Sequence, residues 1–213
     1  ILQSVISEDP DCQIVAGFDI NTDQDTPFPL YSDLSQCKEK ADVIIDFSHY
    51  KAFDNIFGYA RDTKTPIVIA TTSLSETNLA DIETGGDEFP IFRTANLSLG
   101  INLLTKALRD MAGDLEADFD IEIIEKHHNK KADAPSGTAI LLASAINDGL
   151  KNKKNYIFGR HGRDCKRETQ ELSIHAVRGG TIPGEHTVLF AGNDELIEIH
   201  HTALSKKVFA NDA

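Results

Sequence analysis

At 213 residues the chain can bury a substantial core and form one large domain or two smaller ones. Hydrophobic residues make up 40% of it without a long apolar run, so the sequence predicts no membrane-spanning segment. A formal net charge of −13 and a pI near 4.9 weigh against a nucleic-acid partner. Three scattered cysteines and the lack of a basic, apolar leader predict reduced thiols in a cytoplasmic protein.

The first half of the chain, residues 1–97, alternates short β-rich runs with helical runs. Helices are expected at residues 55–62 and 76–84. The expected strands are residues 12–18, 43–47, 66–70 and 90–92. This alternation predicts a parallel sheet with helical connections.

Polar residues follow two of these expected strands. Asp19 comes directly after the first strand, and Ala70, Thr71 and Thr72 stand at the end of the third. Ligands of an open parallel sheet bind beyond the carboxyl ends of its strands, where an acid can accept hydrogen bonds from a ribose. An acid after a strand is also a common turn residue. For Phe47, at the end of the second strand, contact with a cofactor and burial in the core both remain open.

The second half of the chain is dominated by strands and begins with an amphipathic helix at residues 99–111. Another helix is expected from about Ser136 to about Gly149. The expected strands are residues 119–126, 169–177, 186–191 and 196–201. These elements predict an open, mostly antiparallel sheet around the second helix.

The segment between the first of these strands and the helix carries the most chemistry. His127, His128, Lys130 and Lys131 lie within five residues, and Pro-Ser-Gly-Thr then opens the helix. A helix N-terminus directs unpaired backbone amides at an anion, and ammonium groups add charge-assisted hydrogen bonds. Histidine gives or takes a proton near neutral pH. The segment therefore suggests an active site that binds an anion and transfers a proton.

Two other interpretations of this segment remain open on residue types alone. A basic stretch between a strand and a helix can simply be a solvated loop. A zinc site is the second, although His127 and His128 are adjacent and would point to opposite sides of an extended chain. The helical His-x-x-x-His and the Cys-x-x-Cys spacings are both absent.

The segment from Glu125 to Ala139 reads E-x-H-H-x-x-K-x-D-A-P-S-G-T-A. This pattern resembles the signature of the 4-hydroxy-tetrahydrodipicolinate reductase family, formerly dihydrodipicolinate reductase. Further segments match in the family's order: Val43–Ser48, Ile67–Thr72, Ala95–Asn102, Val177–Gly180, Pro183–Thr187 and Phe209–Asn211. The resemblance covers nearly the whole chain.

The resemblance implies an α/β fold of two domains. One is a Rossmann-like dinucleotide-binding domain at residues 1–98, to which residues 207–213 return. The other, residues 99–206, is an α+β domain for substrate binding and tetramerisation, with an open mixed, mostly antiparallel sheet. The family reduces a cyclic dicarboxylate with NAD(P)H in the diaminopimelate route to lysine, and it forms homotetramers through the sheet of the second domain.

The resemblance also implies the roles of individual residues. His127 matches the family's proton donor, and Lys131 matches its partner in donation and in substrate binding. His128 matches a substrate contact, while Gly137 and Thr138 match the pair that holds a carboxylate. The positions assigned to the cofactor are Asp19, Phe47, Ala70, Thr71, Thr72, Thr94, Ala95, Asn96 and Leu97. NADH is expected over NADPH, because the carboxylate of Asp19 would repel a 2′-phosphate and no Arg or Lys follows it closely.

The chain departs from the family pattern at several points. Ala70 stands where the family carries Gly, and Leu97 where it often has Phe. The family's Gly-rich turn, G-x-x-G-x-M-G, is not found before Gly17, the first glycine. We therefore expect a fragment of a longer reductase that lacks the first strand and the family's C-terminal tail, binds the cofactor weakly, and is catalytically weak or inactive. Two alternatives remain: a non-catalytic dicarboxylate-binding fragment, and a metal-dependent hydrolase. The hydrolase would use the histidine pair with His175, His186, His200 or His201.

Overall fold

A computed structural model describes residues 1–72, 74–94 and 96–211. The chain divides into two compact units, Ile1–Ala95 with Ala213, and Asn96–Asp212. The second unit thus begins at Asn96, close to the boundary predicted at residue 99. Lys207–Asn211, helix α6, clusters with the second unit, so the return of residues 207–213 to the first domain stays a prediction. No helix among the described residues is long and apolar enough to cross a membrane.

Short parallel strands joined by helices form the first unit, as the sequence predicts. Its helices are α1 (Leu2–Ile6), α2 (Phe53–Thr63) and α3 (Glu76–Gly85), with 3₁₀ turns at Leu34–Gln36 and Tyr50–Ala52. Its strands are β1 (Gly17–Phe18), β2 (Leu30–Tyr31), β3 (Ile44–Asp46), β4 (Ile67–Ile69) and β5 (Ile91–Arg93). Only two residues of the expected strand 12–18 are paired, and the sequence analysis missed β2, which is equally short.

The strands of the first unit fall into two parallel sheets, β1-β2 and β3-β4-β5. A doubly wound dinucleotide fold has two strands on one side of its first strand and three on the other. The two sheets match these two sides. Most residues predicted to contact the cofactor follow these strands: Asp19 follows β1, Phe47 follows β3, Ala70 to Thr72 follow β4, and Thr94 follows β5.

Helix α2 supplies much of the core of the first unit. Phe53, Ile56, Phe57 and Ala60 recur at helical spacing and are buried against Ile67 and Ile69 of β4. Burying a large apolar side chain contributes about 1.5–3 kcal/mol. This packing fixes α2 against the sheet and so fixes where its strands end.

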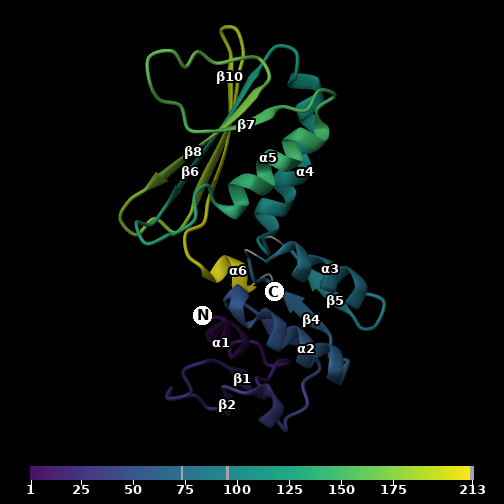
Figure 1. The fold of residues 1–213 in the computed structure, drawn as a ribbon. Coiled ribbons are helices and arrows are strands. Elements are labelled where there is room, and N and C mark those ends of the chain that lie inside the picture. The colour runs from purple at the N-terminus through teal and green to yellow at the C-terminus, as the bar shows by residue number, and fades with distance from the viewer. Residues whose placement is uncertain (73, 95, 212–213) are drawn as a thin grey trace. The chain divides into compact units, whose positions relative to one another are not determined.

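In the second unit, two helices pack on a five-stranded sheet (Figure 1). The helices are α4 (Leu99–Leu115) and α5 (Gly137–Gly149). The strands are β6 (Asp120–His127), β7 (Asn155–Phe158), β8 (Glu171–Arg178), β9 (Glu185–Ala191) and β10 (Leu196–Thr202). The predicted start and end of α5 are confirmed, while β7 was not predicted.

The sheet has the order β10-β9-β6-β8-β7 and is mixed, as expected. The β6–β8 and β7–β8 pairs are parallel, and the β6–β9 and β9–β10 pairs are antiparallel. The long connections explain the two parallel pairs. The crossover through α5 and the loop of residues 159–170 each return the chain to the same end of the sheet, and parallel neighbours require such crossovers.

Alternation along β6 separates two faces of the sheet. Ile121, Ile123, Glu125 and His127 are buried on one face, and the intervening residues are partly exposed on the other. The core of this unit joins the first face to residues of α4 and α5, among them Leu108, Leu142 and Ile146. The strand therefore delivers Glu125 and His127 to the helix-covered side.

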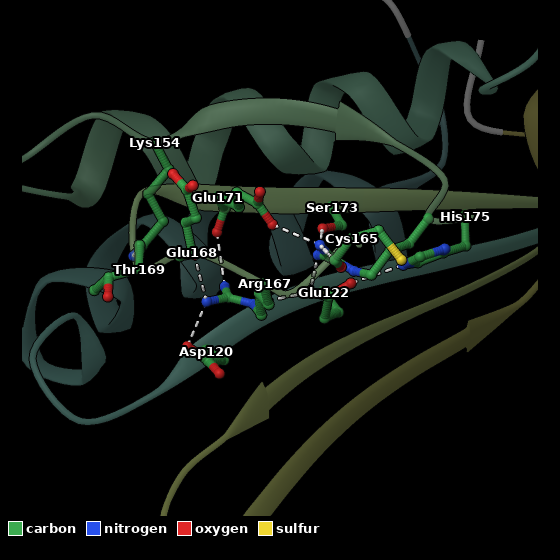
Figure 2. Close-up of polar contacts among 11 residues, drawn as sticks. Asp120, Glu122, Lys154, Cys165, Arg167, Glu168, Thr169, Glu171, Ser173 and His175 are labelled. Carbon is green, nitrogen blue, oxygen red and sulfur yellow. Dashed lines mark hydrogen bonds and ion pairs between the residues drawn. The ribbon is translucent and has the colours of Figure 1, made fainter. Parts of the chain in front are cut away.

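The opposite face carries a network of charged groups (Figure 2). Arg160 and Arg167 of the loop at residues 159–170 form ion pairs with Glu122 and with other acids of β6 and β8. Glu122 Oε2 also lies 2.7 Å from Nε2 of His175. These bonds hold the loop across the sheet, on the side away from Glu125.

Candidate active site

The centre of the site is Glu125, a carboxylate that is 0% exposed. Its Oε2 lies 2.6 Å from Nδ1 of His127 and accepts from Nη1 of Arg178 at 2.7 Å. Its Oε1 accepts from Nη2 of Arg178 at 2.7 Å and from the amide of Ser136 at 2.9 Å. Burial raises the pKa of Glu125, but the hydrogen bonds from Arg178, His127 and Ser136 outweigh it and the pKa lies below its usual value. Glu125 is therefore ionised at neutral pH.

The tautomer of His127 follows from this charge. An ionised carboxylate can only accept, so Nδ1 of His127 must donate to Glu125 and carry a proton. Burial lowers the pKa of His127 and the adjacent Glu125 partly restores it, with a net direction downward. Nε2, the second ring nitrogen, lies beside Gly184, where a Cβ would stand 3.1 Å from it. Glycine at position 184 thus leaves room around Nε2 of His127.

A second buried imidazole packs against the first. The rings of His127 and His186 meet edge to face, with centroids 5.3 Å apart and planes at 72°. Nε2 of His186 lies 2.9 Å from Oγ of Ser136, which also accepts from the amide of Ala139. Burial, together with the charge of His127, lowers the pKa of His186 to about 3, so this ring is neutral at physiological pH.

The N-terminus of α5 forms the anion-binding part of the site. Ser136 is the N-cap, and no heavy atom lies within 4 Å of a Cβ built on Gly137, which leaves open space at the first helical turn. Thr138 Oγ1 accepts from Nδ2 of Asn96 at 2.8 Å and so keeps its own proton to donate. Asn96 is itself fixed, because its Oδ1 accepts from the amide of Ser98.

The loop between β6 and α5 adds positive charge. Nζ of Lys131 lies 2.9 Å from Oδ1 of Asp133, and Lys131 is close enough to lower the pKa of His127. Nδ1 of His128 is buried with no hydrogen-bond partner among the described residues. Arg178 ties the loop down by donating to the carbonyl of Asp133 at 2.7 Å. The loop is therefore anchored at several points, although Asn129, Lys130 and residues 132–134 are exposed.

At the strand ends of the first unit, Asp19 and Phe47 are exposed. Asp19 Oδ1 accepts from the amide of Asn21 at 2.9 Å, and its own amide donates to Tyr31. Phe47, directly after β3, is 43% exposed, so its alternative interpretation as a core residue is wrong. An exposed aromatic ring at this position is available to a flat ligand.

Thr71 is buried, and its hydroxyl is already engaged. Its Oγ1 lies 2.9 Å from Oδ2 of Asp46 and 3.0 Å from the carbonyl of Ser48, which ties the ends of β3 and β4 together. Asp46 was not predicted, although it ends an apolar strand much as Asp19 does. Ala70 is half-buried beside it, and Thr72 is exposed.

The remaining predicted cofactor positions follow β5. Thr94 is half-buried, and its amide donates to Ile69. Ala95 lies outside the described residues. Asn96 and Leu97 are buried in the second unit, where Asn96 holds Thr138.

The described residues contain no group of three or more His, Cys, Asp or Glu side chains placed to hold a metal ion. Two histidines of the hydrolase alternative make their contacts outside this site. His175 pairs with Glu122 on the opposite sheet face, and His200 contacts Thr187 and Thr202 on β9 and β10.

Comparison with known proteins bears on the identity of this site. The family model described as dihydrodipicolinate reductase, N-terminus, matches residues 1–97, and the one described as dihydrodipicolinate reductase, C-terminus, matches residues 100–213. The chain belongs to the dihydrodipicolinate reductase family. It is an NAD(P)H-dependent oxidoreductase of that family, as the signature predicted.

Relatives in this reductase family cover most of the chain. The 4-hydroxy-tetrahydrodipicolinate reductase of Caldanaerobacter subterraneus subsp. tengcongensis is 51% identical over 213 residues, which span 100% of this chain and 84% of the relative. That of Clostridium novyi is 46% identical over 200 residues, 94% of this chain and 79% of the relative. This level of identity confirms the expected function, reduction in the diaminopimelate route to lysine, and does not favour the two alternatives.

Solved structures agree on the fold. Dipicolinate-bound dihydrodipicolinate reductase from Paenisporosarcina sp. TG-14 has a TM-score of 0.71 at 21% identity and covers 99% of this chain and 85% of its own. Aspartate dehydrogenase from Thermotoga maritima has a TM-score of 0.53 at 9% identity and covers 99% and 88%. These likenesses confirm the expected Rossmann-like α/β class.

Sequence reasoning gave no role in the reduction to three residues of the site: Glu125, Arg178 and His186. Glu125 opens the signature and could have been noticed, because residues 125 and 127 share one side of a strand. Arg178 and His186 come from strands about 50 positions further along the chain, and only the pairing of β6 with β8 and β9 brings them to the site.

Proposed function

We propose that this reductase binds a cyclic dicarboxylate, 4-hydroxy-tetrahydrodipicolinate or its dehydrated form, at the N-terminus of α5, and that His127 protonates it during reduction. The single observation that carries this proposal is the Glu125 carboxylate. It bonds both His127, the proton donor, and the amide of Ser136, the N-cap of the anion-binding helix.

The proton donor is suited to its task by its surroundings. His127 keeps one proton on Nδ1 through Glu125, so the proton given up in the reaction comes from Nε2. Burial, and to a smaller extent the charge of Lys131, lowers the pKa of His127 and makes the imidazolium a stronger acid. An anionic substrate would offset part of this effect by attracting the protonated ring.

Gly137 and Thr138 form the proposed binding site for a carboxylate of the substrate, which we call the carboxylate cradle. Helix N-termini favour anions through their free amides and the helix dipole, and the open space at Gly137 admits a carboxylate close to the backbone. The hydroxyl of Thr138, oriented by Asn96, adds a donor. His128 and Lys131 would supply further donors to the same substrate, since Nδ1 of His128 has no partner among the described residues.

NADH or NADPH supplies the hydride when it is bound. The residues available to hold it are those at the strand ends of the first unit, where exposed Asp19 and Phe47 follow parallel strands. Thr71 would contribute through its backbone, since its hydroxyl bonds Asp46 or Ser48. Ala70, Thr72 and the residues at 94–97 complete the predicted set.

The proposal is tested by two substitutions with different effects. His127→Gln should lower kcat roughly a hundredfold, as expected for loss of a general acid, and leave the Kd of pyridine-2,6-dicarboxylate within a few-fold. Thr138→Ala should weaken that Kd about tenfold through loss of a hydrogen bond to a charged group. Near-normal turnover by His127→Gln would refute the proton-donor role.

We also propose that NADH is preferred over NADPH. The carboxylate of Asp19 is exposed at the end of β1, and the three residues after it carry no positive charge. Comparing kcat/KM for the two cofactors tests this, and Asp19→Ala should narrow the difference. A clear NADPH preference of the unaltered protein would contradict it.

The sheet of the second unit is the proposed surface for a homotetramer. Val177 on β8 and Leu196 on β10 are 45% and 54% exposed. By strand alternation both lie on the face away from α4 and α5. Apolar side chains on an open sheet face favour burial against another chain.

A further inference from the structure

We infer that Glu125 and Arg178 form a positioning pair for the proton donor: Glu125 fixes the tautomer and direction of His127, and Arg178 keeps Glu125 from taking its proton. This inference rests on the proposed role of His127 and goes beyond it, because it gives Arg178 a part in the reaction and explains how Glu125 stays ionised.

The hydrogen bonds to Glu125 hold its carboxylate in one orientation. Each of its oxygens accepts two hydrogen bonds at 2.6–2.9 Å, and Arg178 spans both oxygens with its two terminal nitrogens. Such a bidentate clamp fixes the plane of the carboxylate as well as its position. The ring of His127 is therefore held by an acceptor that cannot rotate away.

The charge of Arg178 is what makes this arrangement useful. A buried carboxylate beside an imidazolium would otherwise take the Nδ1 proton and leave a neutral pair, in which the remaining Nε2 proton of His127 is far less acidic. Arg178 stabilises the ionised form of Glu125, and the two charges balance. His127 then has a fixed Nδ1 hydrogen bond and an Nε2 proton to give.

The Glu125–Arg178 ion pair contacts three parts of the site. Arg178 also donates to the carbonyl of Asp133, which pairs with Lys131, and Glu125 also accepts from the N-cap Ser136. His127, the loop between β6 and α5, and the N-terminus of α5 are thus all connected to the Glu125–Arg178 ion pair. Misplacement of a reacting group by about 1 Å can cost roughly a hundredfold in rate, which is the advantage of such a connection.

The charged and titratable groups that face His127 come from every element around it. They are Glu125 on β6, Lys131 in the loop before α5, Arg178 on β8 and His186 on β9. Lys131 and Arg178 lower the pKa of His127, and Glu125 raises it against the larger effect of burial. Removing Glu125 or Arg178 should therefore shift the pKa of His127 in opposite directions.

Two variants test the pair through the pH dependence of kcat/KM. A reaction that needs protonated His127 loses rate as pH rises through its pKa. In Glu125→Gln this loss should begin about one pH unit lower, because the attraction to the carboxylate is gone. In Arg178→Gln the loss of rate should begin at higher pH, because the negative charge of Glu125 is no longer offset by Arg178 and stabilises protonated His127. Both variants should lower kcat at least about tenfold at neutral pH.

A matched control lies three residues earlier on the same strand. Glu122 also hydrogen-bonds an imidazole, His175, at 2.7 Å, but on the opposite face of the sheet (Figure 2). Glu122→Gln makes the same chemical change away from the site and should leave both kcat and the pH profile unaltered. Imidazole ¹⁵N spectra should show Nδ1–H on neutral His127 in the unaltered protein and a mixture of tautomers in Glu125→Gln.

The outcomes separate this inference from the proposed function. A large kcat loss in His127→Gln, with unshifted profiles and unchanged tautomers in Glu125→Gln and Arg178→Gln, would overturn the positioning role alone. Near-normal turnover by His127→Gln would overturn both. If one of the two pair variants does not fold, the direction of the shift in the other still decides.

Discussion

His186 shows how strongly burial acts on a single residue of this site. Its pKa lies at about 3, below the value of 6.5 for an exposed imidazole, because burial penalises the charged ring. In the unfolded chain His186 becomes protonated below about pH 6.5, whereas in the folded chain it stays neutral down to about pH 3. The contribution of His186 to stability is therefore complete above pH 6.5 and is lost as the pH falls through this window.

We expect a corresponding pH dependence of stability. The free energy of unfolding should fall through this group by up to about 1.4 kcal/mol per pH unit between about pH 6 and 4. His186→Gln keeps a partner for Ser136 without the titration, so its stability should fall less steeply. Urea unfolding at several pH values measures the slopes. Exposed His161→Gln is the control, and a His186→Gln slope equal to that of the unaltered protein would contradict the assignment.

Sequence reasoning named the residues that the chemistry of one local segment marks. His127, Lys131, Gly137 and Thr138 stand in one signature, and the structure places them in one unit around the start of α5. It failed for Arg178, because an arginine at the end of a strand has many roles and only the register of β6 with β8 puts it opposite His127. Strand register is a property of the whole sheet and is not visible in a local pattern.

At the scale of elements, α4 and α5 cross at unusually close range. A Cβ built on Gly149 would overlap the carbonyl oxygen of Arg109, and one on Gly113 would stand 2.9 Å from the carbonyl of Gly149. Glycine at 113 and 149 therefore permits the contact that packs the two helices. Since α5 carries the carboxylate cradle at its other end, this contact also sets where the cradle lies.

Gly149→Ala should destabilise the protein by about 1–3 kcal/mol, because the added methyl meets backbone that cannot move without shifting a helix. Gly58→Ala is the matched control: it lies within α2 with nothing within 4 Å of its Cβ. There the alanine should be neutral or stabilising by up to about 1 kcal/mol. Thermal or urea unfolding gives both values, and equal stability of the two variants would refute the close-contact argument.

The elements that sequence predicted best are those with long periodic patterns. Helices α4 and α5 and strands β6, β8, β9 and β10 lie within a few residues of their expected places. Strands β2 and β7 are short and were missed, since two to four residues carry too little periodicity. Which strands pair in parallel is not visible in a local pattern, because it depends on which strands the long connections bring together.

At the scale of the whole molecule, the proposed tetramer gives a direct prediction. Val177→Lys places a charge on the exposed sheet face and should yield smaller species in light scattering at micromolar concentration. Val43→Lys is a matched control, since Val43 is also 45% exposed but belongs to the first unit. Only monomer in the unaltered protein, or equal masses for the two variants, would contradict the proposed interface.

The central claim, that His127 donates the proton, is tested most directly by single-turnover reduction followed across pH. The unaltered protein should lose rate as the pH rises through the pKa of His127, which burial holds below its usual value. His127→Gln should be roughly a hundredfold slower and show no such decline. The account is contradicted if both proteins lose rate in parallel over the same pH range, because the titrating acid would then be another group.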